Sequence, residues 1–438
     1  MRARYIWRHA PFVAVKGTPA LLAAAVLALF LAAAPPSDAA SGPTVFAGTS
    51  WNAERKVAEA PDGTLLATFT EAQGNSTGIA VKRSADRGAS WEILPSPSVG
   101  QAFRSCVAVN STGAVHLAWT QFVAGERQIF YGRWTGGPAW QGVEQLSDTP
   151  GYSGFPSLAV DSADRVHLVW YGYDGLTYQV YYRYLDGAGW HSTAQATRGV
   201  QDANNPAIAI GPDDRVHVAF YSYFRGETDV WYMRGGPAGF DVLERVSAPG
   251  ALASQPSLVV HANGTAAVAY IAGANETLRV LVSERGSAGV WGAPFAASVP
   301  GEAPAAPSLV ADRAGNLAVF FETSAGALRY RARIGGVWAE PITLATPPGN
   351  RWPSASWAAY AGGPNPQNVN VLWTQEANGT FSVGFARVDL FPATPCNCPP
   401  LAPWWQEWAV PLLFIGGAGA SMGALWIAAA RTKGGGRG

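Results

Sequence analysis

The sequence predicts an all-β fold, a seven-bladed β-propeller with four-stranded antiparallel blades. Two observations carry this prediction. A unit of roughly 50 residues recurs along the chain, and its turn residues are spaced by 50, 51, 50, 50 and 51 positions at Gly63, Gly113, Asp164, Asp214, Gly264 and Gly315. Gly (50) and Pro (32) are abundant and aromatic residues make up 12% of the chain, as expected for short strands joined by many turns.

Each copy of the unit contains three apolar runs that read as consecutive strands. In the clearest copy these are Pro156–Val160, Val166–Trp170 and Gln179–Arg183. The second strand of every copy ends on an aromatic residue: Phe69, Trp119, Trp170, Phe220, Tyr270, Phe321 and Trp373. Because one copy cannot bury its own hydrophobic face, neighbouring copies must pack side by side.

The seventh copy is the least regular, with strands expected at residues 353–360, 369–373 and 381–388. A six-bladed propeller with one distorted copy is therefore the alternative. Residues 44–47 precede the first copy and have no partner of their own. We expect them to form the outer strand of the last blade, which would close the ring without an open sheet edge at that point.

Residues 1–40 have the composition of a secretory signal peptide. Basic residues between Arg2 and Lys16 precede an apolar run at residues 20–34, and small residues follow up to Ala40. This order of positive charge, apolar run and small residues is typical of a cleaved export signal. An uncleaved N-terminal anchor is the alternative.

The C-terminal region predicts a membrane anchor. Residues 408–430 contain no charged residue and are long enough to cross a hydrocarbon core of about 30 Å. Tryptophans precede this segment and the basic residues 431–438 follow it, as at the two surfaces of a membrane. The proline-rich residues 392–407 read as a short, semi-rigid stalk. We therefore expect a single-pass protein of the cell membrane, with the propeller, residues 41–391, outside the cell.

The overall composition excludes several classes of protein. Lys+Arg and Asp+Glu are equal at 30 each, so the chain lacks the basic excess of a nucleic-acid-binding protein. Three cysteines are too few for a disulfide-stabilised module. Cys106 reads as a small buried hydrophobic residue, whereas Cys396 and Cys398 lie beside the predicted membrane segment, where a thiol can carry a lipid or bridge two chains. No sequence motif for a metal or a cofactor is present, so none is expected.

Residues 84–91 contain the most specific motif of the chain. Ser84, Asp86, Gly88 and Trp91 fit the pattern S-x-D-x-G-x-x-W. This pattern resembles the Asp-box, or BNR repeat, of sialidases and related propellers, and later copies of the unit carry eroded versions of it. Asp86 can accept backbone hydrogen bonds, Gly88 allows a positive φ, and Trp91 can fill space between sheets. In the family the motif lies away from the active site, so the resemblance implies the fold and not catalysis.

The same resemblance implies where a sialidase site would lie. Family enzymes bind the substrate carboxylate with three arginines and use a tyrosine nucleophile paired with a glutamate, together with an aspartate acid/base. The first arginine belongs to an Arg-Ile-Pro motif, and the corresponding place here is Ala53, two residues before Arg55. The candidates that this chain offers are Arg55, Arg104, Arg351, Glu71 and Glu322. The missing Arg-Ile-Pro motif favours binding over hydrolysis.

In a propeller, the loops that enter first strands and leave second strands share one face around the central axis. On that face we expect aromatic, acidic, amide and arginine side chains: Tyr173, Asp174, Asp202, Asn204, Tyr223, Arg225, Glu227 and Trp352. Such a set suits recognition of a glycan or of a protein on a cell surface. Ordinary exposed loop residues are the alternative interpretation.

Two further groups of residues have simpler interpretations. His116, His167 and His217 occupy one register in three successive copies, too far apart around a ring to share a metal ion, so structural packing is expected. Five N-x-S/T sequons mark possible glycan attachment sites at Asn75, Asn110, Asn263, Asn275 and Asn378.

These observations predict an exported propeller, anchored in the membrane, that binds a glycan or a surface protein through its central face. An exo-sialidase-type glycoside hydrolase is the second hypothesis, and a structural spacer in the cell envelope is the third. The oligomeric state and the identity of the ligand are not predicted.

Overall fold

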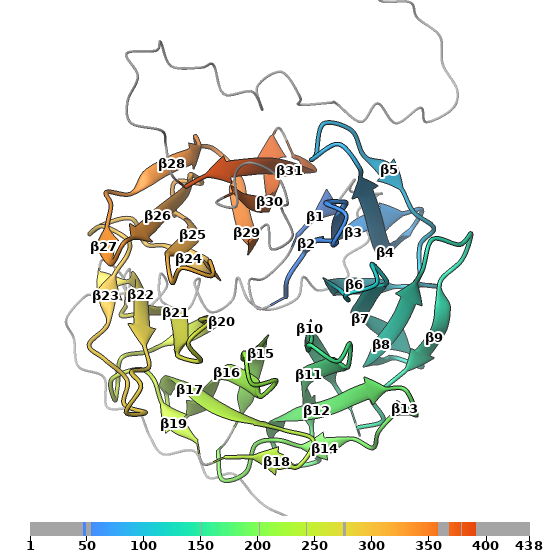
Figure 1. Cartoon of the computed structure of the whole chain (residues 1–438), viewed down its shortest axis with the longest axis horizontal. Helices are drawn as coiled ribbons and strands as arrows, with labels where there is room; N and C mark the ends of the chain where they lie inside the picture. The colour runs from blue at the N-terminus through green and yellow to red at the C-terminus, as the bar shows by residue number, and fades with distance from the viewer. Residues whose placement is uncertain are drawn as a thin grey trace, which may run out of the picture. The chain divides into compact units, whose positions relative to one another are not determined.

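The computed structural model describes residues 47–49, 54–149, 151–200, 202–241, 243–274, 277–357, 368–377 and 379–390. These residues form seven antiparallel sheets that are arranged as blades around a central axis (Figure 1). The propeller is therefore seven-bladed, as the seven copies of the unit predict, and the six-bladed alternative is wrong. The expected signal peptide, stalk, membrane segment and basic tail lie outside the described residues, as do Ala53, Cys396, Cys398, Asn275 and Asn378.

The blades follow one another in chain order. The first blade contains β1 (Ala47–Gly48), β2 (Val57–Glu59), β3 (Leu65–Gln73), β4 (Ser76–Ser84) and β5 (Glu92–Ile93). The second contains β6 (Ala102–Val109), β7 (Val115–Val123), β8 (Glu126–Trp134) and β9 (Gln141–Gln145). The third contains β10 (Ser153–Val160), β11 (Val166–Tyr173), β12 (Tyr178–Asp186), β13 (Gly189–Trp190) and β14 (Ala194–Gln195).

The fourth and fifth blades contain β15 (Ala203–Ile210), β16 (Val216–Phe224), β17 (Glu227–Gly236), β18 (Gly239–Phe240) and β19 (Glu244–Arg245), followed by β20 (Ser254–Val260), β21 (Ala266–Ala272), β22 (Arg279–Glu284) and β23 (Phe295–Ala296). The last two contain β24 (Ala305–Ala311), β25 (Leu317–Glu322), β26 (Leu328–Ile334), β27 (Val337–Trp338) and β28 (Ile342–Ala345), followed by β29 (Asn350–Trp357), β30 (Asn368–Ala377) and β31 (Thr380–Asp389).

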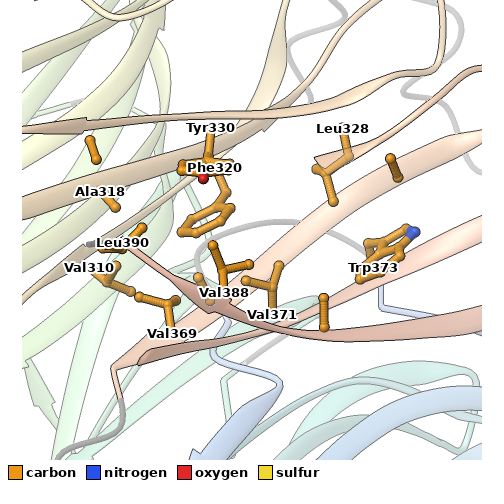
Figure 2. Close-up of a cluster of buried hydrophobic side chains, with 14 residues drawn as sticks. Val310, Ala318, Phe320, Leu328, Tyr330, Val369, Val371, Trp373, Val388 and Leu390 are labelled. Atoms are coloured by element: carbon orange, nitrogen blue, oxygen red, sulfur yellow. The ribbon is translucent and has the colours of Figure 1, made fainter. Parts of the chain in front are cut away.

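The blades follow a four-stranded antiparallel plan in which the outer strand is short and in several blades is broken into two segments. The second strand of each blade is almost entirely buried, because both of its faces pack against neighbouring blades. Figure 2 shows one such core, where Phe320 and Tyr330 of the sixth blade pack with Val371, Val388 and Trp373 of the seventh. The aromatic residues predicted to end the second strands lie in these cores, and Trp119, Trp170 and Phe220 are fully buried.

The first strands carry a recurrent irregularity close to the face at which they begin, called the axial face below. In blades two to seven the pairing of the first with the second strand shifts register there. One residue within each shift has a positive φ although it is not glycine: Arg104, Phe155, Asn205, Gln255, Ala306 and Trp352. Such a conformation costs free energy, so its repetition at one position shows that the blade architecture imposes it.

Hydrogen bonds join neighbouring first strands around the axis. In the third, fifth, sixth and seventh blades the residue two positions after the strained one is a serine, and its hydroxyl accepts a backbone N–H of the next blade. The N···O distance is 2.9 Å from Leu309 to Ser257 and 2.9 Å from Ala355 to Ser308. The same bond, also 2.9 Å, runs from Lys56 N to Ser354 Oγ and crosses the junction of the first and last blades.

The junction of the first and last blades differs from the expected one. Among the described residues the last sheet has three strands, β29, β30 and β31. Ala47 and Gly48 pair with Glu71 and Thr70 of β3 in the first blade. The prediction that this segment forms the outer strand of the last blade is therefore wrong for Ala47, while residues 44–46 lie outside the described residues. The reason is local, because Thr49 N donates to Thr374 Oγ1 at 2.8 Å and holds this segment near the inner strands.

The Asp-box strengthens this junction from the outer side. Asp86 accepts the Ser90 N–H at 2.8 Å and the Ser84 hydroxyl at 2.7 Å, which closes the turn between β4 and β5. Trp91 then packs edge-on against Phe385 of β31, with ring centroids 5.2 Å apart. Gly88 has a φ of +94°, and a Cβ built there would lie 2.1 Å from the Phe385 ring. The Asp-box thus joins the first blade to the last.

The three histidines and Cys106 have structural surroundings. His116, His167 and His217 each share a hydrogen bond with a tyrosine of the adjacent third strand, at 2.7, 2.8 and 2.6 Å. Cys106 is fully buried, and burial raises the pKa of its thiol. No group of three or more metal-binding side chains occurs among the described residues. Within the same part of the chain, no helix has the length and apolar character needed to cross a bilayer.

Candidate functional site

Arginine and tyrosine side chains gather at the axial face of the second and third blades. We call this group the arginine–tyrosine cluster, and it consists of Arg104, Arg127, Tyr152, Phe155, Tyr171 and Tyr178. Its members come from β6, β8, β10, β11, β12 and the loop before β10. Strands of two blades thus bring together residues that are up to 74 positions apart in the sequence, by the difference between 104 and 178.

The tyrosines form a stacked platform. The Tyr152 and Tyr171 rings lie 5.3 Å apart with an interplanar angle of 23°, and Tyr178 meets Tyr171 edge-on at 5.4 Å. Phe155 lies 5.3 Å from Tyr171 on another side. Tyr171 is buried, whereas Tyr152 and Tyr178 are half-buried and keep part of their surface in solvent. Tyr171 therefore forms the buried part of the platform, and Tyr152 and Tyr178 form the part that a ligand can reach.

Two guanidinium groups lie over these rings. The Arg104 guanidinium carbon is 3.7 Å from the centre of the Phe155 ring, and Arg104 Nη1 donates to the Tyr152 hydroxyl at 3.2 Å. The Arg127 guanidinium carbon lies 4.7 Å from the centre of the Tyr152 ring. Cation–π contacts of this kind fix the position of an arginine without neutralising its charge.

In the part of the chain that the structure describes, no carboxylate directly contacts the charged groups of Arg104 and Arg127. Among the ion pairs of the described residues, many other arginines are matched, such as Arg285 with Glu244 at 2.7 Å and Arg351 with Glu376 at 3.0 Å. Neither Arg104 nor Arg127 belongs to an ion pair there. Two half-buried cations on an aromatic platform have the chemistry to bind an anionic group.

The hydroxyls of two tyrosines near Arg104, Tyr171 and Tyr221, stay protonated at neutral pH. Burial raises the pKa of Tyr171 and brings the pKa of Tyr221, at the same position of the next blade, to about 12, although the charge of Arg104 opposes both shifts. The hydroxyls can therefore donate as well as accept hydrogen bonds.

The structure places part of the predicted ligand-binding set beside the cluster. Tyr173 is half-buried, and its ring lies 5.5 Å from that of Tyr178. Asp174 accepts the N–H groups of its own turn, from Leu176 and Thr177, at 2.8 Å each. Asp202 accepts the Thr177 hydroxyl at 2.8 Å. These two carboxylates shape the loop on which the tyrosines are held.

The other members of that set lie elsewhere on the axial face. Asn204 donates to the Asp202 carbonyl at 2.5 Å. Tyr223, Arg225 and Glu227 are exposed at the tip of the hairpin between β16 and β17. Trp352 is half-buried in the seventh blade, where it occupies the strained position of β29.

The three candidate arginines of the sialidase comparison have different neighbours. Arg55 lies in the central channel, where its guanidinium donates to the Leu258 carbonyl of the fifth blade at 3.3 Å. A small cavity beside it is lined by first-strand residues of blades four to seven. Arg351 is exposed and pairs with Glu376, whereas Arg104 belongs to the arginine–tyrosine cluster. The contacts of Arg55 give it the role of filling the channel.

The two candidate carboxylates also occupy separate places. Glu322 accepts the backbone N–H of Trp352 at 2.5 Å, and burial raises the pKa of its carboxyl to about 7 against the opposing charge of Arg351. Burial likewise raises the pKa of Glu71, and the charge of the nearby Lys82 ammonium opposes this rise. Glu322 is therefore protonated to a substantial degree near neutral pH and can donate a proton there.

The raised pKa of Glu322 predicts a dependence of stability on pH. Its pKa rises in the folded protein from the ordinary 4.5 to about 7, so the folded state holds this proton more tightly than the unfolded state. The contribution of Glu322 to stability should then fall as the pH rises from about 4.5 to about 7, and stay low above it. Because the side chain is partly exposed, we expect a loss of about 1–2 kcal/mol.

Urea denaturation of wild type and Glu322→Gln at pH 5, 6, 7 and 8 measures this effect. The stability of Glu322→Gln relative to wild type should increase with pH. Glu126→Gln, which changes an exposed glutamate at the β7–β8 turn, serves as the control and should show no such trend. Parallel pH curves for wild type and Glu322→Gln would contradict the assignment.

Sequence reasoning missed Arg127, Tyr152 and Tyr178. It considered the residues around the ends of second strands and the starts of first strands, whereas Arg127 and Tyr178 lie in the first two residues of third strands and Tyr152 lies just before a first strand. A usable signal was present, because antiparallel pairing across the hairpin places Tyr178 opposite Tyr173 and Arg127 opposite Phe122.

The sequons that the structure describes differ in exposure. Asn75 and Asn263 are exposed, at a hairpin tip and at a turn. Asn110 is 6% exposed, and its side-chain oxygen accepts the Ala114 N–H at 2.8 Å. A glycan is therefore more readily placed on Asn75 or Asn263 than on Asn110.

Comparisons with known proteins find similarity in structure alone. No family model matches the chain, and neither does any curated protein sequence. A PL25 polysaccharide lyase, an ulvan lyase solved bound to -[GlcA(1-4)Rha3S]-, superposes with a TM-score of 0.53 at 10% identity, over 78% of this chain and 95% of its own. The NanB sialidase from Streptococcus pneumoniae gives 0.46 at 11% identity, over 67% and 69%. The GH93 α-L-arabinofuranosidase of Fusarium graminearum gives 0.46 at 15% identity, over 64% and 93%.

Proposed function

We propose that this seven-bladed propeller, which has the fold of the sialidase-like propellers, binds an acidic carbohydrate through its arginine–tyrosine cluster. The observation that carries the proposal is the position of Arg104 and Arg127, two cations that form no ion pair among the described residues, over a platform of tyrosines. A uronate carboxylate or a sulfate group would bind the guanidiniums, and the apolar face of a sugar ring would lie on Tyr152 and Tyr178.

Two other observations support an acidic sugar as the ligand. The fold is shared with an ulvan lyase that was solved bound to a saccharide of glucuronate and sulfated rhamnose. The predicted signal peptide and membrane segment, at residues 1–40 and 408–430, would place the cluster outside the cell, where such polysaccharides occur. The glycan would then be recognised at the surface of the cell that carries this protein.

A glycan array with the full-length protein in detergent micelles tests the proposal. It should include uronate-containing, sulfated and sialylated oligosaccharides, each beside its neutral counterpart. Binding that is selective for the acidic members, and that weakens as salt increases, would support the proposal. Equal binding to neutral members, or silence across the array, would contradict it, and silence would favour the role of a structural spacer.

Cleavage of a glycosidic bond is the second candidate function. The raised pKa of Glu322, about 7, favours it because such a carboxyl can act as a general acid at neutral pH. A panel of fluorogenic glycosides, sialosides included, tests this candidate. Turnover that disappears in Glu322→Gln would establish hydrolysis, whereas binding without turnover would leave the protein as a lectin.

A further inference from the structure

A buried ion pair lies next to the backbone that carries Arg104 of the arginine–tyrosine cluster. Glu54 and Lys56 are both fully buried, and the Lys56 ammonium contacts a Glu54 carboxylate oxygen. Buried charges are rare in proteins because their desolvation is costly, and an ion pair rarely recovers the whole cost. The pair therefore calls for an explanation other than stability.

Lys56 also contacts a residue of the second blade. Besides Glu54, its ammonium donates to the carbonyl oxygen of Ser105, the residue that follows Arg104. The Ser105 hydroxyl is held in turn by Thr68, with an O···O distance of 2.7 Å. The Arg104 N–H is held by the Thr70 hydroxyl at 3.2 Å. Side chains of the first blade thus hold the N–H of Arg104 and the carbonyl and hydroxyl groups of the residue that follows it.

Arg104 has the strained backbone that the blade architecture gives to this position, and the first-blade contacts add a support particular to Arg104. Its φ is 54°, a value that non-glycine residues adopt at a cost in free energy. A change of this φ to a negative value would relieve the strain, but it would displace the chain before Arg104 relative to the chain after it and move the guanidinium off Phe155 and Tyr152. The Thr70 contact to the Arg104 N–H and the Lys56 contact to the Ser105 carbonyl anchor the chain on the two sides and oppose that displacement.

We propose that Glu54 and Lys56 are positioning residues for ligand binding: Lys56 holds the strained Arg104 backbone in its binding conformation, and Glu54 orients Lys56. This inference rests on the proposed function for its role in binding, but the effect on the Arg104 backbone can be measured without a ligand.

The pair can act in either protonation state. Burial raises the pKa of Glu54 and lowers that of Lys56, while the contact between the two opposes both shifts. The charged pair and the neutral pair are related by transfer of one proton from Lys56 to Glu54. In both states the Lys56 nitrogen keeps N–H groups to donate to the Ser105 carbonyl.

Two double variants of the full-length protein test the inference. Glu54→Leu/Lys56→Met replaces the pair with apolar side chains of similar size, a change that buried ion pairs often tolerate. It removes the donor to the Ser105 carbonyl. Glu54→Gln/Lys56→Gln also removes both charges but keeps an N–H donor at position 56. If the apolar variant does not fold, Glu54→Gln/Lys56→Met replaces it in the comparison.

The affinity of the apolar variant for an acidic oligosaccharide selected from the array should be roughly tenfold lower than that of wild type. This is the smaller of the effects that residues supporting the ligands of metal sites have on metal affinity. The Gln/Gln variant should recover most of that loss. Wild-type affinity in a correctly folded apolar variant would overturn the inference, as would an equal loss in both variants.

Hydrogen exchange of the Arg104 amide separates this inference from the proposed function. The amide should exchange roughly tenfold faster in the apolar variant and near the wild-type rate in the Gln/Gln variant. If wild type binds no glycan, the proposed function fails, and the exchange rates alone decide whether the pair positions Arg104. Unchanged exchange in the apolar variant would overturn the positioning role whether or not a glycan binds.

Discussion

Replacing Arg104 with alanine should reduce the affinity for an acidic oligosaccharide by about a hundredfold, which corresponds to roughly 2.7 kcal/mol. The variant removes the guanidinium that lies 3.7 Å from the Phe155 ring and the hydrogen bond that orients the Tyr152 hydroxyl. The substitution therefore removes one positive charge of the site and also the contacts that position the tyrosine platform. Isothermal titration calorimetry at fixed ionic strength measures the change directly.

Matched arginine variants distinguish a specific site from general electrostatic attraction. Arg225→Ala removes the same charge from the exposed tip of the β16–β17 hairpin, outside the cluster, and should change the affinity less than about twofold. Arg104→Lys keeps the charge without the planar guanidinium, so it should recover only part of the loss. Equal losses in Arg104→Ala and Arg225→Ala would show that the ligand responds to overall charge and not to the cluster.

Replacing Gly88 with alanine should destabilise the propeller by about 2–4 kcal/mol, the largest effect that we expect from a single methyl group. The φ of +94° is unfavourable for alanine, and the new Cβ would lie 2.1 Å from a carbon of the Phe385 ring. Phe385 would have to move away from Trp91, which opens the contact between the first and last blades. Equilibrium denaturation in guanidinium chloride measures the loss.

Three further variants separate the causes of that loss. Gly74→Ala has a positive φ of +61° with no atom near the new Cβ, so it should report the backbone cost alone. Gly187→Ala, with neither problem, should be nearly neutral. In Gly88→Ala/Phe385→Ala the clash is absent, so the combined loss should be smaller than the sum of the single losses. Additive losses would mean that Gly88 and Phe385 do not interact.

Much of the fold could be predicted because it repeats. The constant spacing of the turn residues located the blades, and the aromatic residues at the ends of second strands located the cores. The junction of the ring could not be predicted, because it occurs once and has no second copy for comparison. There the path of the chain depends on single contacts such as that of Thr49 with Thr374, which no repeat pattern reveals.

The site was predictable only in part for a related reason. Tyr173, which lies beside the cluster, could be predicted because it lies at the end of a second strand, a position that the repeat identifies. The cluster itself joins Arg104 of one blade to Tyr152 of the next. Contacts between blades depend on side-chain direction and on the strained backbone at Arg104, and neither leaves a signature in the sequence.

Arg55 has a consequence for the shape of any ligand. Its side chain reaches from the first blade to the Leu258 carbonyl of the fifth and so crosses the central channel around which the blades are arranged. A long polymer therefore has no path through the middle of the ring at this level. It must approach from one side and leave from the same side, lying across the axial face or meeting it with a chain end. The protein would then bind a polysaccharide along the side of the polymer or at its end, and the polymer would not pass through the ring.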